Sequence, residues 1–148
     1  MATRGFEFAY SLDGSTPVIR DMAMAAGSYT KGQVVVANSS GYLAAGTASV
    51  TEVTAIVQET DASVSAADEL KCALVTSSQV WKASMDATST NGKVGYTKTF
   101  DVTSTGLGID ADDVTNGRMC LVDTGTDDEG NVLGYVTFRV PTFGNALS

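Results

Sequence analysis

Acidic side chains gather in two short segments, and they are the residues of this chain best placed to do chemistry. The two groups are Asp110, Asp112 and Asp113, and Asp127, Asp128 and Glu129. Paired carboxylates can act as general acid and base, but the chain has no histidine, which removes the usual general base and the Ser-His-Asp triad. Both groups lie in glycine-flanked loops, where acids are ordinarily solvated turn residues. We therefore predict that the chain is not an enzyme.

The second acidic segment, residues 123–131, also has enough side-chain oxygens to suggest a calcium loop. It lacks the regular acidic spacing and the distal glutamate of an EF-hand, so a hairpin tip is the favoured interpretation. Whether residues 127–131 hold a cation stays open. Gly106 and Gly108 lack the third glycine and the βαβ context of a dinucleotide-binding loop. The sequence thus predicts no cofactor.

Charge and composition narrow the range of partners. The 148 residues include 17 acidic and nine basic side chains, for a net charge of −8, and the basic ones are scattered singly. Because phosphate backbones are bound by concentrated Lys and Arg, we expect no nucleic-acid partner. No apolar run is long enough to cross a bilayer and no secretory signal precedes Gly5, so we expect no membrane partner. Cys72 and Cys120 each lie in an apolar run, which favours core thiols made in a reducing cytoplasm.

Short apolar or alternating runs, separated by Gly, Asn, Asp and Ser, predict strands along most of the chain. The expected strands are residues 5–12, 18–24, 31–37, 53–59, 79–85, 95–103, 118–123 and 131–140, with turns at 38–41 and 106–108. Residues 60–67 are expected to form a loop, residues 110–117 a polar connection with room for one helical turn, and residues 124–130 the loop of the last hairpin. Residues 65–74 fit either a capped short helix or a strand, and the alternation of Leu70, Cys72 and Leu74 favours the strand.

These elements predict an all-β protein, either a small β-barrel or a compact β-sandwich, with little helix. We expect one β-barrel domain over residues 17–148, preceded by an arm or edge strand over residues 1–16.

The N-terminal strand carries the strongest candidate binding residues. Strict alternation predicts that Phe6, Phe8, Tyr10 and Leu12 share one face of it. If the strand lies inside its own domain, these side chains are core. If it extends as an arm, three aromatics of roughly 150 to 250 Å² each would anchor a partner surface, and the strand edge could join a neighbour's sheet. The residues alone leave both interpretations open.

Several segments, taken in order, resemble the capsid decoration proteins of tailed bacteriophages, which cement or stabilise the head. They are the stretch from Gly5-Phe6 to Asp13-Gly14, Lys31-Gly32-Gln33-Val34-Val35-Val36, Gly41-Tyr42-Leu43, the strand at 53–57, Asp68-Glu69, and the hairpin at 117–140. The resemblance implies a small β-barrel that docks on an assembled icosahedral shell, often as trimers at threefold points, and ties major capsid proteins together.

From this resemblance we predict a structural virion protein on the outer surface of the capsid, made in the host cytoplasm and self-associating as a trimer. Phe6, Phe8, Tyr10 and Leu12 would contact the capsid or a neighbouring subunit. The alternative is a carbohydrate-binding or adhesion module, such as a head-fibre domain, with Trp81 or Tyr135 in a sugar site. A hydrolase that depends on Asp110 or Asp112 comes third.

Overall fold

The computed structural model describes residues 5–45, 52–85, 95–110 and 117–142, with the backbone alone described for residues 95–99. Every regular element in these ranges is a β-strand, and every pairing between two named strands is antiparallel. The all-β prediction is therefore confirmed. Of the two architectures predicted, the described residues form the compact sandwich, because open sheets pack together and none closes into a barrel.

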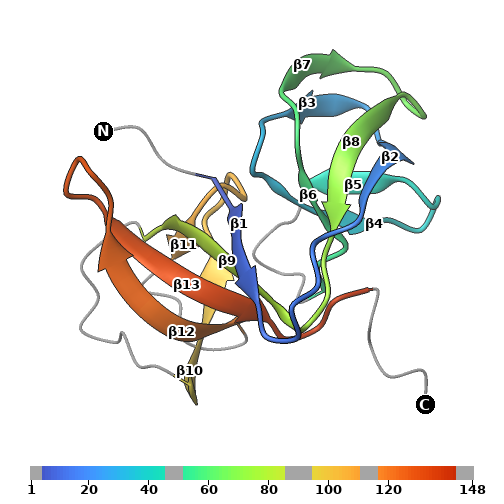
Figure 1. Ribbon diagram of the computed structural model, residues 1–148. Helices are drawn as coiled ribbons and strands as arrows, with labels where there is room; N and C mark the ends of the chain where they lie inside the picture. The colour runs from blue at the N-terminus through green and yellow to red at the C-terminus, as the bar shows by residue number, and fades with distance from the viewer. Residues whose placement is uncertain (1–4, 46–51, 86–94, 111–116, 143–148) are drawn as a thin grey trace.

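The largest sheet has six strands in the order β1-β9-β13-β12-β10-β11 and occupies the lower left of Figure 1. The bounds of these strands are Glu7–Ser11, Gln79–Ser84, Val132–Phe138, Met119–Thr126, Gly95–Val102 and Ile109–Asp110. The N-terminal strand β1 is thus an edge strand that pairs with β9.

The second sheet has five strands in the order β2-β8-β6-β4-β5, at the upper right of Figure 1. Their bounds are Ile19–Ala23, Glu69–Leu74, Ala55–Val57, Val34–Ala37 and Leu43–Ala45. A third sheet pairs β3, Gly27–Tyr29, with β7, Asp61–Val64. β2 follows β1 directly in the chain, so one short connection joins the edges of the two large sheets.

The central strands β4 and β6 of the five-stranded sheet are buried on both faces, which explains their continuous apolar sequence. Side chains on one face join a core shared with the six-stranded sheet: Val34, Ile56 and Ala73. Side chains on the other face join a second core: Val35, Val57 and Cys72. The small sheet adds Tyr29 and Val64 to that second core, so the three sheets form three successive layers.

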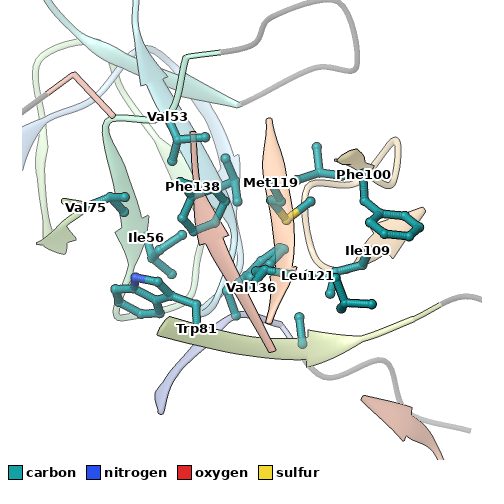
Figure 2. Close-up of a cluster of buried hydrophobic side chains, with 14 of the residues drawn as sticks. Val53, Ile56, Val75, Trp81, Phe100, Ile109, Met119, Leu121, Val136 and Phe138 are labelled. Atoms are coloured by element: carbon teal, nitrogen blue, oxygen red, sulfur yellow. The ribbon is translucent and has the colours of Figure 1, made fainter. Parts of the chain in front are cut away.

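The shared core contains the buried tryptophan and the three fully buried phenylalanines of the described residues. Figure 2 shows Ile56 and its neighbours Val53 and Val75 gathered with Trp81 and Phe138 of the six-stranded sheet. The Phe6 ring packs on the Phe138 ring with their centroids 5.6 Å apart. Burial of this mixed aromatic and aliphatic surface holds the two large sheets together.

Main-chain hydrogen bonds also connect the two large sheets. The Phe6 N–H donates to the Gly32 carbonyl oxygen at 2.9 Å, and the Val34 N–H donates to the Gly106 carbonyl oxygen at 3.0 Å. Gly5 and Gly32 touch backbone to backbone, because a Cβ built on Gly32 would lie 2.8 Å from the Gly5 Cα. The start of β1 is therefore fixed to the loop that precedes β4.

Most predicted strands are present, but β3, β7 and β11 were not predicted as strands, and the last hairpin differs in its loop. Residues 69–74 form strand β8, as the alternation favoured, and residues 38–41 turn the chain between β4 and β5. Residues 60–67 are not simply a loop, because Asp61–Val64 forms β7. The last hairpin also has a shorter loop than expected, since Thr124 to Thr126 still pair with Val132 to Gly134. The predicted connection at 110–117 falls mostly on residues 111–116, outside the described ranges.

Candidate functional site

The acidic hairpin tip is an internally bonded turn. The Asp127 Oδ1 atom accepts hydrogen bonds from the N–H groups of Glu129 and Asn131, at 2.9 and 2.8 Å. The Asn131 side-chain amide donates to Asp127 Oδ2 at 2.9 Å, and Gly130 adopts a φ of +83°. The Asp127 carboxylate thus stabilises the turn, in agreement with the hairpin-tip interpretation.

Of the first acidic group, Asp110, Asp112 and Asp113, only Asp110 lies within the described residues. Asp110 lies in β11 opposite Asp101 of β10, and Asp112 and Asp113 lie outside the described residues. Asp101 itself forms a buried ion pair, with its Oδ1 atom 2.7 Å from Arg118 Nε. Burial lowers the pKa of Arg118, and the adjacent Asp101 carboxylate opposes that shift. The sequence contains no local signal for this pair, because the partners are 17 positions apart, with Asp101 on β10 and Arg118 directly before the neighbouring strand β12.

The two thiols and the single tryptophan belong to the interior. Cys72 and Cys120 are buried and form no disulfide, in line with the prediction of core thiols. Burial is the main cause that raises the pKa of the Cys72 thiol to about 12, with smaller contributions from Glu59 and Asp21. Trp81 is 1% exposed, and its Nε1–H donates to Gln79 Oε1 at 3.1 Å. Its rings therefore offer no open face for a sugar.

Phe6, which directly precedes β1, and Phe8 in the first half of β1 pack on the core. Phe6 is buried against Phe138, and Phe8 packs edge-on against Trp81 with ring centroids 5.7 Å apart. Phe6 and Phe8 are therefore core residues, as the first of the two interpretations predicted. Of the arm and the edge strand predicted for residues 1–16, the segment Glu7–Ser11 forms an edge strand.

The second half of β1 faces the opposite way, which corrects the prediction of one shared face. A bulge interrupts the pairing between Phe8 and Tyr10, so that Phe8 stands opposite Trp81 but Tyr10 stands opposite its neighbour Val80. Directly opposed residues share a face and adjacent residues on β9 do not, so the bulge moves Tyr10 to the other face of the sheet. Leu12 follows Tyr10, with its N–H donating to the Ser78 carbonyl oxygen at 2.7 Å.

Tyr10 and Leu12 belong to a small set of exposed apolar side chains, which we name the β1–β2 apolar segment. Its members are Tyr10, Leu12, Val18 and Ile19, which are 45%, 67%, 55% and 50% exposed and are the large hydrophobic side chains that stand exposed among the described residues. The sequence analysis missed Val18 and Ile19 as binding candidates. The sequence does show an apolar pair, Val18 and Ile19, next to Pro17 at the start of a strand. These two side chains are exposed because β2 is an edge strand, which the sequence does not show.

A tight turn holds the middle of this segment. The Asp13 Oδ1 atom accepts hydrogen bonds from the Ser15 N–H at 3.0 Å and from the Ser15 hydroxyl at 2.6 Å. These bonds to Ser15 lower the pKa of Asp13 to about 2, and Gly14 supplies the left-handed φ of +82° that the turn requires. The connection between Leu12 and Val18 is therefore locally ordered and carries a negative charge at neutral pH.

No match to this chain was found among protein-family models, curated proteins or solved structures. Among the described residues, no group of three or more His, Cys, Asp or Glu side chains is arranged to hold a metal ion. The same residues contain no helix with the length and apolarity needed to cross a bilayer. The β1–β2 apolar segment is accordingly the candidate site that the geometry offers.

Proposed function

We propose that this chain is a structural virion protein that binds the outside of an assembled phage capsid and stabilises it by bridging major capsid proteins. The observation that carries the proposal is the β1–β2 apolar segment. Hydrophobic residues exposed singly are ordinary on protein surfaces, whereas several exposed within one short stretch of chain favour an interaction site. Here the exposed large hydrophobic residues of the described ranges all fall between positions 10 and 19, at the edges of both large sheets.

The small size of this surface favours attachment to a repeating partner. A stable interface between two proteins buries about 800 Å² on each side, more than four partly exposed side chains supply. A trimer of this chain at a threefold point of the shell would engage several such contacts at once and so bind more tightly than one contact allows. Binding to the assembled lattice alone then stabilises it by mass action.

The remaining polar groups support a structural role without turnover. The Asp127 carboxylate is bonded within its own turn, and Asp101 and Arg118 pair in the interior. The adhesion alternative would place a sugar on Trp81 or Tyr135, and the burial of Trp81 removes the better of these two platforms. We expect neither nucleic acid nor membrane as a partner, and we place the mature protein on the capsid surface after synthesis in the host cytoplasm.

Saturation binding to isolated capsids of the encoding phage tests this function. Wild-type protein should saturate at a fixed copy number per capsid, and Leu12→Asp should lower the apparent affinity at least about tenfold, because it places a charge in an apolar contact. Ala62→Asp is the matched control, since it adds the same charge at an exposed position of β7. Binding that never saturates, or equal losses in both variants, would contradict the proposal.

A further inference from the structure

A groove of about 370 Å³ runs along the start of β1. Residues 5–8 line one side of it and Lys31, Gly32 and Gln58 line the other, and the two sides meet where the Gly32 backbone touches Gly5 and bonds to Phe6. The volume lies at the lower end of the range for ligand sites. Because one wall is the edge of a β-strand, the shape suits an extended peptide.

The β1 wall presents main-chain groups that no described strand pairs with. β1 is the last strand of its sheet, so β9 pairs with its inner edge only. The Phe6 N–H points outward, to Gly32. Alternate residues of a strand direct their N–H and C=O groups to the same edge, and the bulge begins only after Phe8. The N–H and C=O of Phe8 therefore face the groove as a donor and an acceptor for an added strand.

The opposite wall supplies a positive charge. The Lys31 N–H is held by Thr60 Oγ1 at 3.0 Å, and its exposed side chain has no acidic partner among the described residues. The acidic group that lines the groove, the Glu7 carboxylate, lies 4.0 Å from the Lys82 ammonium on β9. Phe8 adds a partly exposed aromatic ring. A fitting occupant offers main-chain hydrogen bonds, an apolar side chain and a carboxylate.

We propose that this groove binds an extended, carboxylate-bearing segment of a protein partner, which joins the outer edge of β1 as a further strand. Main-chain bonds to Phe8 supply the affinity, and Lys31 selects the acidic side chain and sets the register. The inference deepens the proposed function and rests on it for the identity of the partner, a capsid subunit.

Selection from a random heptapeptide library against the full-length protein tests the groove without any capsid. The selected peptides should carry Asp or Glu among alternating apolar residues, and titration with them should shift the backbone amide resonances of Phe8 and Lys31. Lys31→Gln should weaken their binding about five- to tenfold and Lys31→Glu should weaken it further. Lys71→Gln removes an exposed charge of β8 that pairs with Asp21, and it should leave the affinity unchanged. Failure to select peptides, selection without acidic residues, or equal effects of both Gln variants would overturn the groove proposal.

Capsid binding by Lys31→Glu separates this proposal from the proposed function. A loss of capsid affinity in Lys31→Glu, with peptide selection as described, supports both. Capsid binding equal to that of the wild type overturns the groove as a capsid contact and leaves the proposed function standing. Peptide binding by a wild-type protein that does not bind capsids overturns the proposed function and retains the groove.

Discussion

The central strands of the five-stranded sheet and the edge strands β1 and β2 contain similar apolar residues but place them in different surroundings. In β4 and β6 successive side chains enter two different cores, so Val34 and Val35 are both buried. At the start of β1, Phe6 and Phe8 pack on the core, whereas Tyr10 is exposed. In β2, Ile19 is half exposed at the sheet edge. A strand covered on both sides has no apolar side chain left for a partner, whereas an edge strand does.

The same comparison applies within β1. Phe6 and Phe8 anchor the strand in the shared core, and the bulge then turns its second half toward solvent. One strand is thereby divided into a structural half and a half available for binding. Removing the entire strand would remove its core contacts and its exposed side chains together, so point substitutions are needed to separate their effects.

Replacement of Phe6 by Ala should have the largest effect on stability. Phe6 is 2% exposed and packs on Phe138, so the change should cost about 3–5 kcal/mol in the free energy of unfolding. Tyr10→Ala, four positions along the same strand, should change it by no more than about 0.5 kcal/mol, because the side chain is largely solvated. Urea unfolding of both variants measures the difference, and similar losses would contradict the division of β1.

The two-sided burial of the central strands could be predicted from sequence, because an uninterrupted run such as Val34 to Val36 has no polar face. Strand β7 could not be predicted from sequence, since Asp61, Ala62 and Ser63 are exposed and only Val64 of this strand is buried in the core. That strand exists because β3 pairs with it, which is a non-local effect.

The candidate site was predicted only in part for the same physical reason. Strict alternation places Tyr10 and Leu12 with Phe6 and Phe8, and no Gly or Pro at position 9 announces the bulge. The exposure of Ile19 depends on sheet order, and the groove depends on Lys31 and Gln58 approaching residues 5–8. Local sequence patterns contain no information on the order of strands in a sheet or on which distant segments approach each other.

The glycine contact between the sheets gives the next largest prediction. Gly32→Ala places a Cβ 2.8 Å from the Gly5 Cα at a φ of +91°, whereas Gly41→Ala meets open space at a φ of +83°. The left-handed backbone alone should cost about 1–2 kcal/mol in both variants, and the clash should add at least about 1 kcal/mol for Gly32. Equal midpoints in urea unfolding would show that the two sheets separate easily at this contact.

The last prediction concerns the pH dependence that Cys72 contributes in the five-stranded sheet. Its thiol has a pKa of about 12 in the folded protein against an ordinary value of 9.0, so the unfolded chain loses this proton first. The contribution to stability is complete below pH 9 and declines as the pH rises from 9 toward 12. Urea midpoints at pH 8, 9.5 and 10.5 should therefore fall less steeply for Cys72→Ala than for the wild type. Parallel slopes would place this thiol in contact with solvent.

A cryo-electron-microscopy reconstruction of phage capsids saturated with the protein would show whether the chain binds the shell and through which residues. We expect ordered density for the chain on the outer surface, with Tyr10, Leu12, Val18 and Ile19 against the shell or a neighbouring copy. Contact made instead through the exposed face of β3 and β7, with residues 10–19 open to solvent, or capsids that show no bound density at saturating protein, would contradict it.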